Sequence, residues 1–458
     1  MMKFSTWLGY SALVMAIAWG GCSLAPQELK QEEAKANEVG KAYEKPVGER
    51  KLPELAAEPT WREVLQRAFL ANGDLEAAYW EWRAAIERVD MAAAYPNSNI
   101  SVGYSYMFSA EKIKTWDRQT VAVGFDPAMN LKLPQKVQQS GKVAFDQAQA
   151  AGLRFESAKF DLQKKVLTAW LDFALMAEQV RIAKENAALL KSVSTLASDR
   201  VKAGAPQQDL LKAQTDYRLA ENQVGNMEAE LGQMRAMLNG MLARPGDAVL
   251  NPPRELPEGR AIPDDAKLIA MGVDRNPALG ALAKDVQGRT DALKLAKMAY
   301  LPDINPTFSF TGSVAQVAGA AVMLPTTIPM IEGQIKEARM MMQASEAMVR
   351  QSKSDRAGQF VATLVALRNA ERQRDVFAEI IMPKSKQVWT SSRQAYTAGQ
   401  ISYSELVDTQ RTLLDVRRLV AEVRIEREKR LAELETLAGV DVETLKPAAT
   451  EPTTKPGQ

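Results

Sequence analysis

The phrase AGQISYSELVDTQ, from Ala398 to Gln410, occurs earlier in a second form as AGAPQQDLLKAQ, from Ala203 to Gln214. Both versions begin with alanine and glycine, continue to an acidic residue and two apolar residues, and end on glutamine. Glycine favours the tight turn that ends one helix before the next begins. Because the same phrase returns about two hundred residues later, it predicts an internal duplication of a helix-turn-helix unit.

The start of each copy carries a second repeated phrase. TWREVLQRAFLANGDLEAA, at Thr60–Ala78, corresponds to DDAKLIAMGVDRNPALGAL, at Asp264–Leu282, and each contains an Asn-x-x-Leu step. Both copies continue with a helical period and stop at a proline, Pro96 or Pro302. Proline ends helices because it lacks the amide donor and restricts the residue before it. The sequence therefore predicts one helix before each of these prolines.

After each proline the apolar residues alternate with a period of two, which predicts strands. We expect strands at about 99–108, 119–126, 305–312 and 317–324, of which the last alternates weakly. One face of these strands is apolar and aromatic, and the opposite face is small and polar. The predicted lipid-facing residues are Ile100, Val102, Tyr104, Tyr106, Phe108, Phe308 and Phe310.

The helical period then returns for about 70 residues in each copy. It predicts long helices at about 134–203 and 329–398, each about 100 Å long. The shorter helices before the strands and after the glycine turn together match the long helix in length. Each copy therefore predicts two short helices running antiparallel along one long helix.

The helix after the first turn has a heptad seam, which predicts coiled-coil packing. The seam consists of Leu210, Ala213, Tyr217, Ala220, Val224, Met227, Leu231, Met234, Leu238 and Met241. A shorter seam in the second copy runs from Leu406 and breaks at Arg427. We interpret the methionines of these helices as core packing.

These patterns divide the chain into a signal peptide at 1–21, a lipidated tether at 22–59 and a first structural repeat at 60–245. A linker at 246–263, a second repeat at 264–442 and a disordered tail at 443–458 follow. The N-terminal apolar stretch ends in WGGC, and the chain's one cysteine, Cys22, stands where a bacterial lipoprotein signal is cut. We expect lipidation of Cys22, while an ordinary secretory signal with an incidental cysteine is the alternative.

The composition excludes several classes of function. The chain has no histidine and one cysteine, so we expect no His/Cys metal site, no Ser-His catalytic centre and no internal disulfide. No group of acidic and basic residues forms a catalytic cluster, and we expect neither an enzyme nor a cofactor. A net charge of +2 without a basic patch gives no nucleic-acid partner.

The predicted architecture points to a membrane duct. Four strands per chain are too few for a closed barrel, whereas three chains would supply twelve, and only closed barrels leave no β edge unpaired in lipid. The long helices of three chains can form a tube continuous with that barrel. The fold class predicted is mainly α with a transmembrane β element, two internal repeats per chain, and a trimer forming a 12-stranded β-barrel continuous with an α-helical barrel.

At this point the chain resembles the TolC-like outer-membrane efflux protein family, the exit ducts of tripartite export systems. The resemblance depends on the order of several motifs across nearly the whole chain. These are the two Asn-x-x-Leu steps, the Y-P and L-P strand starts, SGK at Ser140–Lys142, PMIEGQI from Pro329, IIMPKS with Pro383, and Y-x-x-G-x-x-S-x-x-E-L-V-D-x-Q at the second turn.

The resemblance implies a homotrimer in the outer membrane of a Gram-negative-type bacterium, lipid-anchored and extending into the periplasm. It also implies a periplasmic adaptor and an inner-membrane pump of the RND or ABC type as partners. The exported substrate stays open, because the pump selects it. The residues that would contact the adaptor are the turn residues Ala203, Gly204, Ala398 and Gly399.

In the family, acidic residues just past the second turn line the closed periplasmic mouth. The matching residues here are Glu405 and Asp408, and Asp209 is the acidic residue of the first copy. Ser402-x-x-Glu405 is also a capping box, so Glu405 either caps its helix or lines the pore. A second class of function, a non-conducting periplasmic coiled-coil scaffold lipoprotein, shares the helices but does not need aromatic strands of period two.

Overall fold

The computed structural model describes residues 24–95, 100–108, 111, 113–125, 132–202, 204, 206–253, 255–256, 260, 274–312 and 315–440. The predicted signal peptide and tail, Cys22 and Ala203 lie outside these residues. Two compact units make up the chain, and each is described by itself. The first contains Ala77–Phe155 and Ala278–Ser352 with the N-terminal segment up to Lys41, and the second contains the rest.

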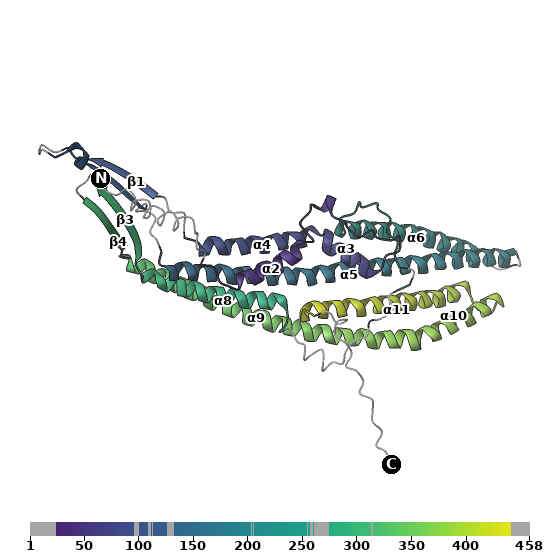
Figure 1. The fold of residues 1–458 in the computed structure, drawn as a ribbon. Helices are drawn as coiled ribbons and strands as arrows, with labels where there is room; N and C mark the ends of the chain where they lie inside the picture. The colour runs from purple at the N-terminus through teal and green to yellow at the C-terminus, as the bar shows by residue number, and fades with distance from the viewer. Residues whose placement is uncertain are drawn as a thin grey trace, which may run out of the picture. The chain divides into compact units, whose positions relative to one another are not determined.

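The first unit carries a four-stranded antiparallel sheet whose strands follow one another in chain order (Figure 1). The strands are β1 (Ile100–Tyr106), β2 (Gln119–Phe125), β3 (Asp303–Thr311) and β4 (Ala315–Met323). Pairing of β2 with β3 joins the hairpin of the first repeat to that of the second. The weakly alternating fourth strand pairs with β3 over nine residues, so the second hairpin is complete in this structure.

Over β1, β2 and β3 the register of the sheet separates an apolar face from a polar face. Tyr104 is opposite Val121, which is opposite Phe310, and all three side chains are exposed. On the other face, the Oγ1 atoms of Thr120 and Thr311 form a hydrogen bond of 2.9 Å. β1 ends at Tyr106, so Phe108, which we expected inside the strand, follows it with its ring against that of Tyr106.

The helices of the first unit pack closely through small residues. This unit contains most of α4 (Gly73–Ala93) and nearly all of α8 (Pro277–Lys297), together with the beginnings of α5 (Pro134–Lys202) and α9 (Ile328–Asp375). A Cβ at Gly141 would lie 2.8 Å from the Ala93 Cβ, and one at Gly280 would lie 3.3 Å from Leu153. Glycine therefore permits α5 to approach α4 and α8 more closely than a larger residue would.

The N-terminal segment differs from the expected tether. Helix α2 (Leu29–Gly40) buries Leu29 and Ala36, and a Cβ at Gly40 would lie 2.1 Å from the Tyr79 Oη on α4. The segment LKQEEAKANEVG is rich in strong helix formers, with leucine and alanine seven residues apart on one face. The segment that we expected to be a polar linker is therefore a helix that packs against α4.

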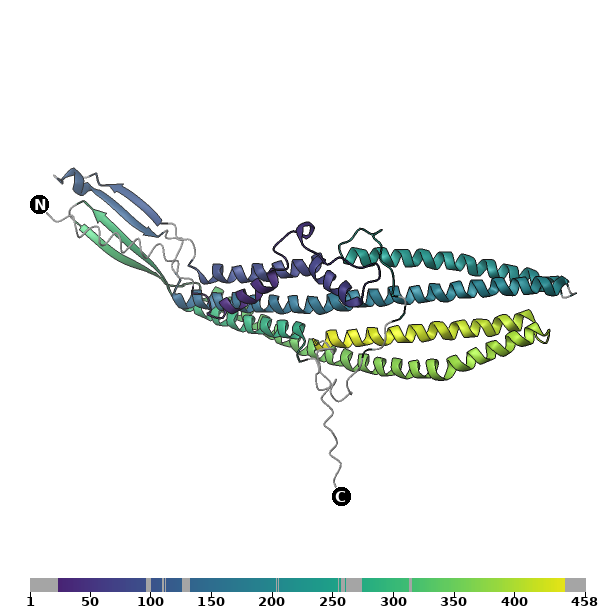
Figure 2. The ribbon, with the colours of Figure 1, turned by 45° about the vertical axis from the view of Figure 1, so that its right-hand side comes forward.

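The second unit contains two helical hairpins (Figure 2). One joins the end of α5 to α6 (Gln207–Met241), and the other joins α10 (Met382–Thr397) to α11 (Tyr403–Ala438). All ten positions of the predicted seam on α6 are buried or half-buried, which confirms the heptad register. Helix α3 (Trp61–Ala71) begins at a capping box formed by Thr60 and Glu63.

Two breaks correct the predicted helix lengths. The helix before the first strands divides into α3 and α4 at Asn72, whose Oδ1 accepts a hydrogen bond of 3.1 Å from the Leu75 amide. The second long helix is interrupted by a π-helical segment, Val376–Ile381, which ends two residues before Pro383. Proline cannot donate to the carbonyl four residues earlier, and a π turn accommodates this loss within a continuous helical path.

Both turns between the paired helices depend on a left-handed glycine. Gly204 has φ of 102° and Gly399 has φ of 76°. In contrast, Gly225 lies inside α6 with open space around it.

We expect Gly399→Ala to lower the free energy of unfolding by about 1 kcal/mol, because an L-residue is strained at positive φ. The matched control Gly225→Ala should raise it by about 0.5–1 kcal/mol, since alanine is the better helix former. Urea unfolding followed by circular dichroism measures both. Equal effects of the two substitutions would contradict the role assigned to the turn.

Candidate functional site

The two hairpins of the second unit meet at their turns in a small aromatic core. Tyr396 from α10 and Tyr403 from α11 are each 1% exposed, and their rings make an edge contact at 6.4 Å. They pack with Val193 and Ala197 of α5 and Ala213 of α6. The two turns are therefore held together by packing that involves all four helices.

Polar contacts reinforce this core. The Tyr403 hydroxyl donates a hydrogen bond of 2.9 Å to the Asp216 carboxylate of α6, and the Arg200 guanidinium lies 4.5 Å from the centre of the Tyr396 ring. Burial raises the pKa of Tyr403, and the hydrogen bond to Asp216 and its negative charge raise it further. The phenol therefore stays protonated at physiological pH and acts as a permanent donor.

The three acidic residues predicted for the pore lie beside these turns. The Glu405 carboxylate accepts a hydrogen bond of 3.0 Å from the Ser402 amide, so the capping box forms. Asp408 is exposed on α11. Asp209 is half-buried in the first turn of α6, where Pro206 supplies no side-chain cap. The capping role of Glu405 is thus visible, and its pore role stays a prediction.

A groove lies behind the turns, between α5, α6 and α11. It has a volume of about 320 Å³ and a mixed lining, with apolar side chains such as Leu190 and Met227 beside polar ones such as Gln179, Asn186 and Arg411. The Gln410 amide reaches into its wall, where it donates to Asn186. Its Oε1 is buried and accepts no hydrogen bond from the described residues.

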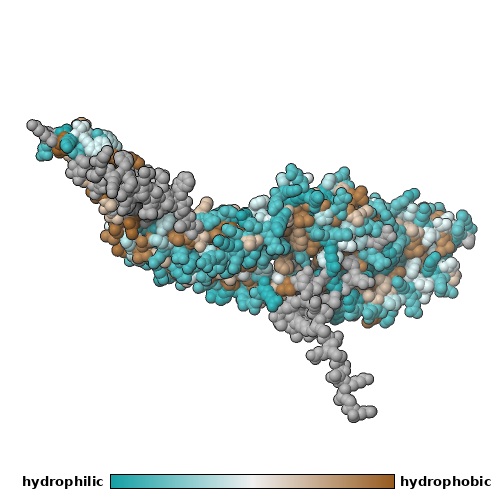
Figure 3. All heavy atoms as spheres, in the orientation of Figure 1, coloured by the Kyte–Doolittle hydropathy of each residue, from teal (hydrophilic) through white to brown (hydrophobic). Residues whose placement is uncertain are grey.

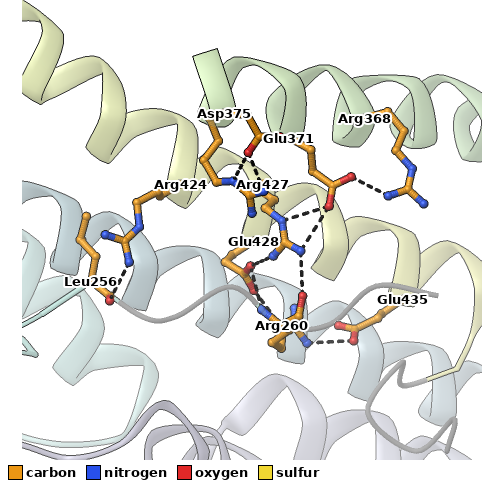
Figure 4. Close-up of polar contacts among 10 residues, drawn as sticks. Leu256, Arg260, Arg368, Glu371, Asp375, Arg424, Arg427, Glu428 and Glu435 are labelled. Carbon is orange, nitrogen blue, oxygen red and sulfur yellow. Dashed lines mark hydrogen bonds and ion pairs between the residues drawn. The ribbon is translucent and has the colours of Figure 1, made fainter. Parts of the chain in front are cut away.

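A buried ion-pair cluster, which sequence reasoning missed, holds the linker between the repeats against α11 (Figure 4). Arg260 bonds Glu428 at 3.0 Å and Glu435 at 2.9 Å. Arg427 donates to the Arg260 carbonyl at 2.8 Å. The only sequence signal was the break of the second heptad seam at Arg427.

The cluster reaches α9 as well. Arg427 lies 2.5 Å from Glu428 and 3.3 Å from Glu371, and Glu371 also pairs with Arg368 at 2.5 Å. Three arginines and three glutamates compensate one another in this cluster, which fits the rule that buried charges need partners.

The described residues show neither of two other kinds of site. None of the described helices is apolar over a stretch long enough to span a membrane. Among the same residues, no three His, Cys, Asp or Glu side chains come together in a way that could bind a metal ion.

The sheet presents the other candidate surface, an exposed apolar one. Val102 is 67% exposed, Tyr104 63% and Phe310 40%. Apolar side chains also cover β4 and the start of α9, where Figure 3 shows a brown surface. They include Val322, Leu324, Ile328 and Met330, whereas the exposed Val317 and Met323 lie on the opposite face, in register with Ser309 and Asp303. The side chains of Ile100 and Phe308 lie outside the described ones, although both residues pair in the sheet.

Comparisons with known proteins identify the fold. No family model matches the chain, and no curated protein matches it in sequence. Among solved structures, the outer membrane protein VceC from Vibrio cholerae is 13% identical with a TM-score of 0.70, over 83% of this chain and 96% of that one.

Two further structures are outer membrane channels. CmeC from Campylobacter jejuni is 12% identical with a TM-score of 0.69, over 89% of this chain and 93% of that one. MtrE from Neisseria gonorrhoeae, solved in an open state, is 16% identical with a TM-score of 0.68, over 86% and 94%. The chain therefore has the fold of the TolC-like outer-membrane channels.

We expect Arg427→Ala to destabilise the second unit by about 3–5 kcal/mol, because it removes the central cation and leaves two arginines to balance three glutamates in the cluster. Arg430→Ala is the matched control on the same helix. Its side chain is 38% exposed and pairs with glutamates on its own helix, so the cost should stay below about 1 kcal/mol. Thermal unfolding in detergent compares the two, and a similar cost for both would contradict the importance of the cluster.

Proposed function

We propose that the chain is one protomer of a homotrimeric outer-membrane exit duct that conducts substrates passively. The duct would receive them from a periplasmic adaptor and an inner-membrane pump of the RND or ABC type. The observation that carries this proposal is the open four-stranded sheet, which has an exposed apolar face and two outer strands. The fold shared with VceC, CmeC and MtrE supports it.

The sheet is incomplete by itself. β1 and β4 are its outer strands, and neither has a second partner within the described chain. Unpaired edges are prone to association in water and are not tolerated in lipid. Two further copies would pair β1 of one chain with β4 of the next and close a barrel of twelve strands. The same step would satisfy the backbone groups of both edges.

The faces of the sheet suit such a barrel. The row of Tyr104, Val121 and Phe310 would meet lipid, and the row of Thr120 and Thr311 would line the lumen. Trp116, which is 64% exposed beside β2, fits an aromatic girdle at the membrane interface.

An acyl chain on Cys22 would further anchor the protein in the outer membrane. The Leu24 amide donates a hydrogen bond of 3.0 Å to the Ala93 carbonyl at the end of α4, shortly before β1. Leu24, the first described residue after Cys22, is thereby fastened to the end of α4. A lipid on Cys22 would enter the outer membrane that the strands cross.

The turns of the second unit would form the periplasmic end. Glu405 and Asp408 lie three residues apart on α11, and both are exposed. In a trimer they would supply six carboxylates to one narrow mouth, together with Asp209 of each chain. Such a ring attracts cations and repels itself when it narrows. The turns at Gly204 and Gly399, with Ala398, are the surfaces we assign to the adaptor.

The strands give the first test. We expect Tyr104→Asp to abolish insertion of the purified trimer into lipid vesicles, because it places a charge on the lipid-facing row. Ser105→Asp, one residue on and on the opposite face, should insert normally. Vesicle flotation measures insertion. Normal insertion of the Tyr104 variant would favour the periplasmic scaffold, as would a wild-type protein without conductance in planar bilayers.

The acidic mouth gives the second test. Asp408→Asn should weaken the cation preference of the channel and move the reversal potential in a salt gradient towards zero. Glu230→Gln, at an exposed position on α6, removes the same charge elsewhere and should leave the reversal potential unchanged. An unchanged selectivity in the Asp408 variant would remove Asp408 from the pore.

A further inference from the structure

The contact between α5 and α8 in the first unit contains a buried pair of carboxyl groups that the proposed function does not use. Three other polar residues of α5 have complementary partners nearby. Lys136 pairs with Asp303 of β3 at 2.7 Å, Gln139 donates to the Asp291 carbonyl of α8 at 3.0 Å, and Arg154 pairs with Asp285 of α8 at 2.5 Å. Asp146 instead faces Asp291, which is another acid.

Both carboxyl groups are enclosed. Asp146 is 7% exposed and Asp291 is 6% exposed. A Cβ at Gly288 would lie 3.3 Å from the Asp146 Cβ, so the backbone of α8 closes one side of the Asp146 side chain. Water therefore has little access to stabilise a charge at this position.

The two acids differ in their other partners. Asp291 accepts a hydrogen bond of 2.7 Å from Lys294. The Oδ2 atom of Asp146 is buried and accepts no hydrogen bond from the described residues. An ionised carboxylate only accepts hydrogen bonds, so two ionised groups cannot bond each other. A single proton on Asp146 turns the facing pair into a donor and an acceptor.

The surrounding charges agree with this assignment. Burial, followed by the charge and the hydrogen bond of Asp291, raises the pKa of Asp146 to about 6 against the opposing charges of Lys284 and Lys294. Burial would also raise the pKa of Asp291, but the Lys294 ammonium and hydrogen bonds from Gln139 and Gln287 hold it below its usual value.

The charged groups that act most strongly on Asp146 are Asp291, Lys284 and Lys294, and all three lie on α8. α9 contributes Ser345 and Met348 to the adjoining cavity, and α4 contributes Ala93 beside Gly141.

We propose that Asp146 and Asp291 form a proton-operated lock between α5 and α8, below the strands of the first unit. With the proton bound, the Asp146 hydroxyl donates to the Asp291 carboxylate and holds the helices together. When the O–H bond breaks, the proton passes to water and two carboxylates repel each other across the Gly288 contact. The lock depends on local packing alone. The proposal therefore does not require that the protein is a conducting duct.

The sign of the pH dependence follows from these groups. The raised pKa of Asp146 means that the folded state retains a proton that the unfolded chain releases near the usual value of 3.8. The stabilisation is complete below that value and is lost as the pH rises through about 6. The change corresponds to roughly a hundredfold in the folding equilibrium constant.

Asp146→Asn tests the lock, because the amide keeps the shape and donates to Asp291 at every pH. In the full-length protein in detergent, we expect this variant and the wild type to have the same thermal midpoint at pH 5. At pH 8 the variant should be more stable. Asp285→Asn, which removes the half-buried partner of Arg154, should retain the pH dependence of the wild type.

Infrared spectroscopy gives a readout that a purely structural role would not change. The wild type should show the carbonyl band of a protonated carboxylic acid that disappears near pH 6, and Asp146→Asn should lack it. Asp291→Asn should move the disappearance to lower pH, because the neighbouring charge is gone. A stability difference that is the same at pH 5 and pH 8, or the absence of the titrating band from the wild type, would overturn the proposal.

Discussion

Close lateral packing of long helices is the constraint on which the rest of this structure depends. A helix of 69 residues such as α5 gains most of its stability from the face that it buries against its neighbours. The chain meets this requirement with small residues at the contacts, among them Ala213, Ala220, Gly141 and Gly280. They allow the helices to approach closely, and this approach is what encloses the polar groups between them.

The effect of a buried charge on these helix contacts depends on whether it has a partner of opposite charge. The cluster around Arg427 is charge-compensated and fastens the linker at Arg260 to α11 and α9. The facing acids Asp146 and Asp291 lack one donor, so their contact depends on a proton. Low exposure strengthens both effects, because buried charges are poorly screened by solvent.

The two repeats share a plan but differ in detail. Asn72 accepts a hydrogen bond from Leu75 at the start of α4, and Asn276, immediately before α8, donates to the carbonyls of Thr436 and Leu437 at the end of α11. The repeated asparagine thus marks a helix start in both copies while it makes different contacts. The first long helix is uninterrupted, whereas the second widens into a π-helical segment before Pro383. The two repeats therefore share the order of their helices and strands more closely than they share individual hydrogen bonds.

The sequence by itself determined the repeated order of helices and strands, because period, proline and glycine act locally. It also located the turn at Gly399, the seam on α6 and the apolar row of β1. Only the tertiary structure decided that residues 29–40 form a docked helix, that β4 pairs with β3, and that Arg427 and Asp146 are buried beside charges. These features depend on residues far apart in the chain, and no local pattern encodes which distant side chain will share a buried contact.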